Sequence, residues 1–161
     1  MALLDELKSE KVGVLADPTP LVLAPETSVE EAVAAMRRSG GGCALVAHDA
    51  HDAHGKRLVG IFTERDLLFR VVAQARKPSI KVSEVMTPNP DSLAPDDHLG
   101  LAIRHMTEGG HRNLPLTDPQ GRILGLLTVK QVIDYLAEHF PENVLNLPPR
   151  PGQAARTVDG G

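Results

Sequence analysis

The chain has 161 residues, of which 42% are hydrophobic and 24% are charged, so it can build a compact unit with an apolar core and is not a disordered protein. Its formal net charge at pH 7 is −4, so the sequence lacks the basic character typical of a nucleic-acid binder, and no nucleic-acid partner is expected. The single cysteine, Cys43, excludes an intrachain disulfide and a multi-cysteine metal site, and it fits a cytoplasmic location best.

The first segment, residues 1–11, carries acidic residues early and has no long apolar run. We therefore expect neither a signal peptide nor a membrane span, and no membrane partner. The segment is predicted to form a short amphipathic helix.

An internal repeat organises most of the remaining chain. A shift of 70 positions lays the first half on the second, and beyond the middle of each half the shift falls to 65, which reveals a five-residue insertion in the first half. The superposed residues are Pro18, Pro20, Leu23, Ala24, Pro25, Ala32, Met36 and Gly40 on Pro88, Pro90, Leu93, Ala94, Pro95, Ala102, Met106 and Gly110, followed by Arg57, Gly60 and Thr63 on Arg122, Gly125 and Thr128. The two halves are therefore predicted to share one fold.

Each half is predicted to begin with a short extended segment, residues 21–23 and 91–93, because the flanking prolines disfavour helix. A helix follows in each half, since apolar residues recur at i, i+4 and i+7. Gly40 and Gly110 are suited to a left-handed cap and are predicted to end these helices.

A pair of strands and a second helix complete each half. In the second half, strands over residues 113–117 and 122–127 flank a stretch, residues 118–121, whose Pro and Gly positions favour a type I turn, so a hairpin is predicted. The closing helices carry apolar stripes within residues 67–72 and 132–140. Each half therefore has the predicted order β-α-β-β-α.

A half of about 55 residues buries too little surface to be secure alone, so we expect the two halves to pack together. The predicted fold class is α+β (α/β), with tandem β-α-β-β-α repeats packed sheet to sheet about a pseudo-two-fold axis. The predicted organisation is an N-terminal helix over 1–11, a first repeat over 12–76, a linker over 77–85, a second repeat over 86–140 and an extended proline-rich tail over 141–161.

One motif stands where the last strand of each half meets its closing helix. It reads Gly60-Ile61-Phe62-Thr63-Glu64-Arg65-Asp66 in the first half and Gly125-Leu126-Leu127-Thr128-Val129-Lys130-Gln131 in the second. The Thr of each motif and the polar residue three positions later have the spacing of a helix capping box. The pattern also resembles the CBS (cystathionine β-synthase) domain over about residues 12–140, as do Val85-Met86-Thr87-Pro88 and His111-Arg112-Asn113-Leu114-Pro115-Leu116.

The resemblance implies that an adenosine-containing ligand, such as AMP, ADP, ATP, NAD or S-adenosylmethionine, binds between the paired sheets. It places Asp66 on the ribose and Thr63 near a phosphate, with Thr128 in a second pocket that departs from the pattern at Gln131. A carboxylate accepts hydrogen bonds from both ribose hydroxyls, whereas the Gln131 amide offers one acceptor oxygen, so the first pocket is expected to be the better one.

Two further groups of residues are candidate ligand contacts by family position. The adenine edge is expected to meet backbone and apolar groups of Thr19, Pro20, Leu21, Ala44 and Ile61, which are also ordinary core positions. His111 and Arg112 superpose on Gly41 and Gly42, so only the second repeat carries cations there. Arg112 is a candidate phosphate ligand with His111 beside it, and a solvated surface arginine is the alternative.

The insertion in the first half contains His48, His51 and His54, which have donor atoms suited to Zn²⁺ or Ni²⁺. A metal site needs ligands held by a rigid surrounding, and this segment has the character of a solvated loop tip, so the three histidines are weak candidates.

The sequence contains no G-x-x-x-x-G-K-[ST], G-x-G-x-x-G, H-E-x-x-H or G-x-S-x-G motif, and no enzymatic activity is predicted. The resemblance implies a regulatory sensor that forms a homodimer and signals to a separate protein target. The alternative is a metal-binding or protein-interaction scaffold that uses the histidine loop and has degenerate nucleotide pockets.

Overall fold

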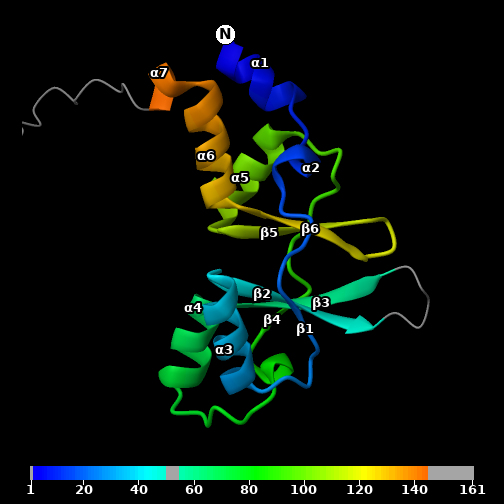
Figure 1. Ribbon diagram of the computed structural model, residues 1–161, viewed down its shortest axis with the longest axis vertical. Coiled ribbons are helices and arrows are strands. Elements are labelled where there is room, and N and C mark those ends of the chain that lie inside the picture. The colour runs from blue at the N-terminus through cyan, green and yellow to red at the C-terminus, as the bar shows by residue number, and fades with distance from the viewer. Residues whose placement is uncertain (1, 50–54, 145–161) are drawn as a thin grey trace, which may run out of the picture.

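The computed structural model describes residues 2–49 and 55–144 and arranges them as two β-sheets that face each other, with helices on the outer side of each sheet (Figure 1). One sheet has four strands in the order β1-β2-β3-β4, and the other has the two strands β5 and β6. The expected pair of α+β repeats packed sheet to sheet is therefore confirmed.

The first repeat is built from β1 (Val22–Leu23), α3 (Val29–Ser39), β2 (Cys43–Asp49), β3 (Lys56–Thr63), α4 (Glu64–Asp66) and the π-helix η1 (Leu67–Val72). Helix α3 begins at a capping box in which Ser28 accepts from the Glu31 backbone N–H and Glu31 accepts from that of Ser28. It ends at Gly40, whose φ of 71° lies in the left-handed region, as predicted.

The second repeat contains α5 (Leu99–Gly109), β5 (Asn113–Thr117), β6 (Ile123–Thr128) and α6 (Val129–His139). Gly110 caps α5 with a φ of 67°. The predicted β5–β6 hairpin is confirmed, and Asp118 holds its turn by accepting from the backbone N–H groups of Gln120 and Arg122 at 2.9 and 2.8 Å. The extended segment over 91–93 forms a single parallel bridge, Leu93 to Leu116, rather than a strand.

The two repeats exchange their opening segments. Strand β4 (Thr87–Pro88), which leads into the second repeat, pairs antiparallel with β3 of the first repeat, where Thr87 lies opposite Ile61. In the same way Asp17, which leads into the first repeat, exchanges two backbone hydrogen bonds of 2.9 and 3.0 Å with Leu126 on β6. We call residues 16–17 and 86–88 the crossover segments. Because of them, neither sheet is complete without the other half of the chain.

The glycine that opens each motif makes room for the opposite crossover segment. A Cβ on Gly60 would lie 2.3 Å from the sulfur of Met86, and a Cβ on Gly125 would lie 2.9 Å from the carbonyl oxygen of Asp17. At Gly125 the close contact is with the backbone of the crossover segment, which a side chain would displace, whereas at Gly60 it is with the Met86 side chain.

Three apolar clusters hold the molecule together. One lies under the helices of the first repeat and includes Phe62, and a second lies under those of the second repeat and includes Leu127. The third, formed by Cys43, Leu45, Ile61 and Leu126, joins residues of both repeats. Its members come from β2, β3 and β6, so this cluster is the contact between the two sheets.

The N-terminal segment belongs to the second repeat in space. Helix α1 (Ala2–Ser9) lies within the range 1–11 predicted for an N-terminal helix, and a second short helix, α2 (Val12–Leu15), follows it. Val12 on α2 is fully buried in the second repeat's core. The Tyr135 hydroxyl on α6 donates to the carboxylates of Glu6 and Glu10 at 2.6 and 3.0 Å, which fixes α1 against this repeat.

Two other segments differ from their predicted character. The predicted linker over 77–85 contains the 3₁₀ helix η2 (Val82–Glu84) and buries Val82 and Val85 in the first repeat's core, so its apolar residues make it part of that repeat. The tail expected to be extended from residue 141 begins instead with the helical turn α7 (Pro141–Val144), because proline is well suited to a first helical position. The rest of the predicted tail lies outside the described residues.

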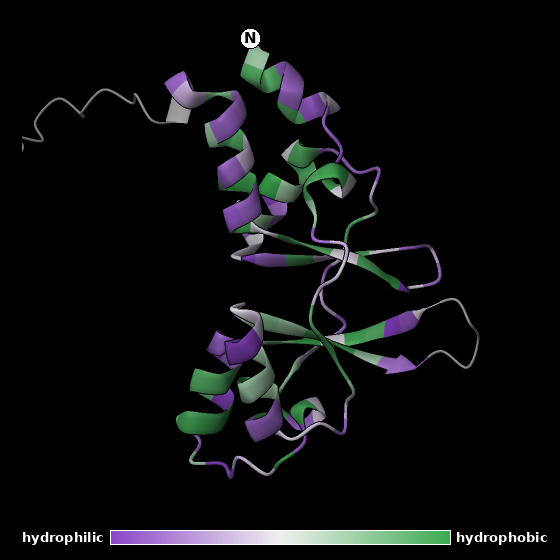
Figure 2. Ribbon diagram, viewed as in Figure 1, coloured by the Kyte–Doolittle hydropathy of each residue, from purple (hydrophilic) through white to green (hydrophobic). Residues whose placement is uncertain are grey.

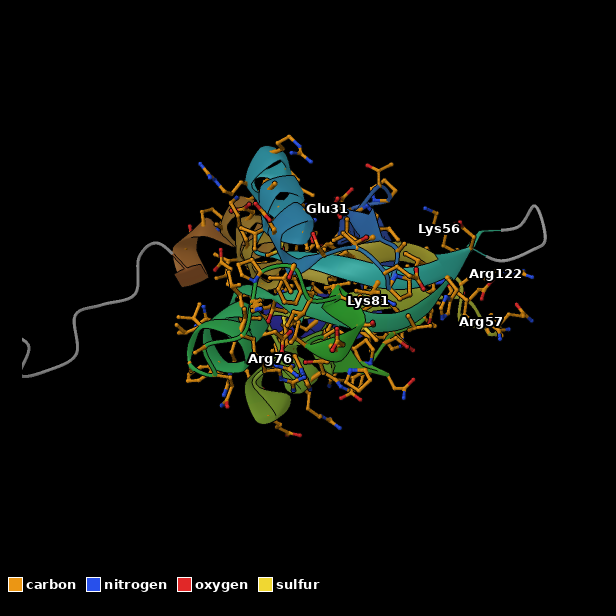
Figure 3. The ribbon with its side chains drawn as sticks, turned by 90° about the horizontal axis from the view of Figure 1, so that it is seen from below. Glu31, Lys56, Arg57, Arg76, Lys81 and Arg122 are labelled. Carbon is orange, nitrogen blue, oxygen red and sulfur yellow. The ribbon has the colours of Figure 1, made fainter. Side chains whose placement is uncertain are left out.

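The far ends of the two hairpins also meet. Arg57 and Arg122, which superpose in the sequence repeat, form an antiparallel bridge, and the Leu58 N–H donates to the Gly121 carbonyl at 3.0 Å. Figure 3 shows Lys56, Arg57 and Arg122 at this end of the molecule. The pseudo-two-fold relation therefore extends from the motifs to the hairpin ends.

Replacing Gly125 by Ala tests whether the crossover depends on the motif glycine. The new Cβ would meet backbone rather than a flexible side chain, so we expect a loss of about 1–3 kcal/mol in the free energy of unfolding, measured by urea denaturation. Gly41→Ala is the control, because its Cβ has no neighbour closer than 3.7 Å. Equal stability of the two variants would contradict the crossover packing.

Candidate functional site

Strand alternation decides which motif side chains face the opposite sheet. Phe62 is buried in the cluster under the first repeat's helices, whereas Ile61 is buried in the cluster between the sheets. Because successive side chains of a strand point to opposite faces, Thr63 lies on the same face as Ile61. Thr128 lies on the same face as Leu126 for the same reason. The two motif threonines therefore end their strands on the inner faces of the sheets.

Thr63 and Asp66 form the capping box that the sequence predicted. The Thr63 hydroxyl oxygen accepts from the Asp66 N–H at 3.2 Å, and Asp66 Oδ2 accepts from the Thr63 N–H at 3.0 Å and from its hydroxyl at 3.1 Å. Thr128 and Gln131 repeat the box at the start of α6, where Gln131 Oε1 accepts from the Thr128 N–H at 2.8 Å.

The other oxygen of Asp66 is engaged by two residues that the sequence analysis did not select. Asp66 Oδ1 accepts from the Thr87 hydroxyl at 3.0 Å and lies 3.5 Å from Nε of Arg70. Arg70 also donates to the backbone carbonyls of Val85 and Met86 at 3.4 and 2.6 Å. Asp66 is only 6% exposed, so a buried carboxylate connects the first motif to the segment that opens the second repeat.

The corresponding position in the second repeat has a different chemistry. Asp17 superposes on Thr87 and lies opposite Leu126, just as Thr87 lies opposite Ile61. Asp17 Oδ1 accepts from the N–H and the hydroxyl of Thr19 at 2.8 and 3.2 Å. The predicted adenine contact Thr19 is thus held by a residue that pairs with the second repeat's sheet.

The other predicted adenine contacts lie along the first sheet. The Leu21 carbonyl accepts from the Leu45 N–H at 2.9 Å, and Pro20 before it is half-buried. The Ala44 side chain is fully buried under the helices, so only its backbone is available. Ile61 is the member of this group that shares the inner face with Thr63 and lies opposite Thr87.

His111 and Arg112 differ in how they are held. His111 Nε2 lies 3.2 Å from Asp91 Oδ2, and its ring passes so close to Gly109 that a Cβ there would lie 2.5 Å from it. The Arg112 carbonyl accepts from the Val129 N–H at 3.0 Å, which places Arg112 beside the start of α6 and therefore beside Thr128. Its exposed side chain makes no ion pair within residues 2–49 and 55–144.

The remaining histidines divide between partnered and solvent-facing positions. His105 Nδ1 lies 3.8 Å from Asp91, and the His139 ring stacks on Tyr135 with centroids 4.1 Å apart, so both have partners that the sequence did not reveal. His48 is exposed near the end of β2, and His51 and His54 lie outside the described residues. Among the residues that are described, no group of three or more His, Cys, Asp or Glu is placed to hold a metal ion.

Two surface hollows lie away from the motif threonines. One of about 430 Å³ is lined by Phe69, Arg70, Gln74, Arg76 and Glu84, and one of about 270 Å³ by Arg104, His105, Glu108 and Gly109. The first is connected to the buried carboxylate only through Arg70. Neither hollow is lined by Thr63, Asp66 or Thr128, and we place the candidate site on the inner faces of the sheets.

The family model described as CBS domain matches residues 12–73 and 82–138. The chain belongs to the CBS domain family. An uncharacterized protein of Methanopyrus kandleri is 26% identical over 128 residues, which are 79% of this chain and 63% of that protein. The chain spans less than two thirds of the length of the first curated relatives that it matches.

Solved structures agree with this assignment. An uncharacterized conserved protein from Pyrococcus horikoshii superposes with a TM-score of 0.72 and 26% identity, over 80% of this chain and 92% of its own. CBSX2, solved in complex with AMP, superposes with a TM-score of 0.68 and 26% identity, over 80% of this CBS pair and 97% of its own chain. None of the helices in residues 2–49 and 55–144 has the length and apolar character needed to cross a bilayer.

Cys43 offers a test of the packing between the sheets. Burial, with a smaller contribution from the negative charge of Glu64, raises the pKa of the Cys43 thiol from its ordinary 9.0 to about 11. We expect the folded protein at pH 8 to react with Ellman's reagent roughly 100-fold more slowly than the urea-unfolded chain, from the lower thiolate fraction alone. Because the folded pKa is raised, this group's contribution to stability is complete below pH 9 and is lost as the pH rises toward 11. Equal reaction rates in the two states would contradict the buried position.

Proposed function

We propose that this CBS pair is a non-catalytic regulatory module that binds an adenosine-containing nucleotide between its sheets and reports the binding to another protein. The supporting observation is the capped pair Thr63 and Asp66 on the inner face of a sheet, within a family match that covers both repeats. The AMP complex of CBSX2, with 26% identity and a TM-score of 0.68, supports an adenosine nucleotide as the ligand class.

In the proposed first pocket, Asp66 binds the ribose and the start of α4 receives the phosphate. A carboxylate is an acceptor-only group and binds a hydroxyl pair through its two oxygens. The Thr63 hydroxyl and the positive end of the helix dipole at the start of α4 favour an anion. Ile61 and backbone groups of Thr19, Pro20, Leu21 and Ala44 remain our candidates for the adenine edge.

The partners of Asp66 give a route from the ligand to the rest of the molecule. A ribose hydroxyl that donates to Asp66 Oδ1 competes with the Thr87 hydroxyl and with Arg70. Both residues also hold the segment that opens the second repeat, Thr87 as part of β4 and Arg70 through the carbonyls of Val85 and Met86. Binding therefore changes the contacts between the repeats, which is the differential interaction that a regulatory signal requires.

The first test is a thermal-shift panel of AMP, ADP, ATP, NAD and S-adenosylmethionine on the wild type and on Asp66→Asn. We expect at least one ligand to raise the melting temperature of the wild type, because a ligand that binds only the folded state stabilises it. The amide has one acceptor oxygen, so affinity in the first pocket should fall about 10-fold or more, which removes about 1.4 kcal/mol of ligand stabilisation per factor of ten.

Glu31→Gln is the matched control, because Glu31 belongs to the capping box of α3 and lies on the outer side of the first repeat (Figure 3). It should lose capping stability without losing the ligand-induced shift. If no ligand in the panel shifts the wild type, or if Asp66→Asn responds as fully as Glu31→Gln, Thr63 and Asp66 act only as a helix cap.

We further infer that two such modules pair through their outer helices. Leu68, Phe69 and Val72 on η1 are 54%, 56% and 62% exposed, and Ile133 on α6 is 51% exposed. Figure 2 shows the hydrophobic residues of the α4 and η1 segment on the outside of the first repeat. Leu68 and Ile133 superpose in the sequence repeat, so each repeat presents an exposed apolar residue at the corresponding place. In a two-fold symmetric homodimer the same patch on both copies would be buried at the interface.

Phe69→Glu tests this pairing. A charge in the centre of an apolar interface is costly to bury, so we expect the variant to be a monomer by light scattering at concentrations where the wild type is a dimer. Leu124→Glu is the control, because Leu124 is 46% exposed but lies on β6, away from the outer helices. A monomeric wild type, or equal masses of both variants and the wild type, would contradict the proposed interface.

A further inference from the structure

The second pocket differs from the first not only at the motif residue Gln131 but also in the crossover segment that faces the motif. Under the repeat superposition Asp66 corresponds to Gln131, and Thr87 corresponds to Asp17. In the first pocket Thr87 and Asp66 are hydrogen-bonded to each other across the crossover, at 3.0 Å. A carboxylate and a neutral hydrogen-bonding side chain have therefore exchanged places between the crossover segment and the helix start.

The backbone places Asp17 on the inner face of the second sheet. Asp17 and Leu126 are directly opposite in an antiparallel bridge, so their side chains lie on the same face of the sheet. The Leu126 side chain is buried in the cluster between the sheets. Asp17 is half-buried there and stands on the same face as Thr128.

The carboxylate of Asp17 is less occupied than that of Asp66. Thr63, Thr87 and Arg70 engage both oxygens of Asp66, whereas Thr19 engages only Oδ1 of Asp17. Within the described part of the chain, no hydrogen bond or ion pair reaches Asp17 Oδ2. Gln131 Oε1 accepts a hydrogen bond from the Thr128 N–H. Among the same described residues, the amide NH₂ group of Gln131 has no acceptor.

The helix start beside Asp17 is also the more favourable of the two for a phosphate. The first turn of α4 contains Glu64 and Asp66, whereas that of the eleven-residue α6 contains no acidic residue. Arg112 lies beside the α6 start through its carbonyl contact with Val129. Positive potential at a helix N-terminus is reduced by neighbouring carboxylates, so an anion is better placed at α6.

We propose that Asp17 is the ribose-binding carboxylate of the second pocket, in place of Gln131, and that this pocket takes a phosphorylated adenosine nucleotide through Thr128, Arg112 and the start of α6. This inference rests on the proposed function. It reverses the expectation from the motif alone, under which Gln131 weakens the second pocket.

The test uses isothermal titration calorimetry of the full chain with AMP and with 2′,3′-dideoxyadenosine monophosphate, which lacks the ribose hydroxyl pair. We expect Asp17→Asn to weaken AMP binding about 10-fold to 100-fold, because the ribose hydroxyls lose a charged hydrogen-bond acceptor. Binding of the dideoxy nucleotide, which lacks these hydroxyls, should be unchanged. Each titration is made both in the wild type and in the Asp66→Asn background. In that background the first pocket is weakened, so the measured affinity is that of the second pocket. Asp96→Asn, an exposed carboxylate paired with Lys11, is the matched control.

A second pair of variants guards against a merely structural effect of Asp17. Asp17→Thr should weaken AMP binding, and the double variant Asp17→Thr with Gln131→Asp, which recreates the pair Thr87 and Asp66, should restore it. Urea denaturation of each variant without ligand shows whether it folds. Restored binding supports the exchange of the carboxylate between the two positions.

The outcomes separate this inference from the proposed function. One outcome is that AMP binds the wild type while Asp17→Asn and Asp17→Thr bind AMP as tightly as the chain with Asp17 does, both with Asp66 present and in Asp66→Asn. Asp17 then has no role in ligand binding, and only the inference is overturned. The same holds if Asp17→Asn weakens AMP and the dideoxy nucleotide equally, because the carboxylate then does not contact the hydroxyl pair. If neither nucleotide nor any member of the earlier panel binds the wild type, both proposals fail.

Discussion

The structure depends on the exchange of the crossover segments between the two repeats. Each motif glycine approaches the crossover segment of the other repeat so closely that a side chain would collide with it. The exchange buries Val12 in the second repeat and pairs β4 with the first sheet. It also brings a polar residue, Thr87 or Asp17, to the inner face beside each motif. Every candidate pocket is therefore made from both halves of the chain.

Under the proposed function, the helix cap formed by Thr63 and Asp66 also takes part in ligand binding. The capping box satisfies backbone groups that a helix start leaves unpaired, and such a cap contributes about 0.5–2 kcal/mol. A hydrogen bond from a ligand to Asp66 has an energy similar to that of the internal contact that it replaces. The protein can therefore exchange between the capped state and the ligand-bound state. Because Thr87 and Arg70 attach Asp66 to the opening of the second repeat, the exchange alters an interface rather than one side chain.

The sequence was sufficient wherever the determinants are a few residues apart. The glycine caps at Gly40 and Gly110, the two motif capping boxes and the β5–β6 turn depend on local chemistry and were predicted. The crossover was not predicted, because the pairing of Asp17 with Leu126 joins residues far apart in the chain and leaves no periodic signal. For the same reason Arg70, Thr87 and Asp17 were missed as neighbours of the motifs. The repeat superposition already aligns Asp17 with Thr87, and that alignment is the signal that could have identified them.

The closing helix of the first repeat shows a second limit of pattern-based prediction. Its apolar residues predict an α-helical stripe, yet residues 67–72 form a π-helix that buries Val71 and exposes Leu68 and Val72. Hydrogen bonds of the i→i+5 type, from Ala73 to Leu68 and from Arg76 to Val71, rotate these side chains away from the core. The sequence reveals that the residues are apolar, but the backbone decides which of them another molecule can reach.

The proposed binding of an adenosine nucleotide between the two sheets can be observed at the level of single residues. The most direct measurement is to titrate the isotope-labelled protein with AMP and to follow its backbone amide NMR signals. We expect the largest shifts at the two helix starts, residues 63–66 and 128–131, and in the crossover segments. Shifts confined to the outer hollow around Arg76, or no shifts at all with AMP at millimolar concentration, would contradict the proposed binding.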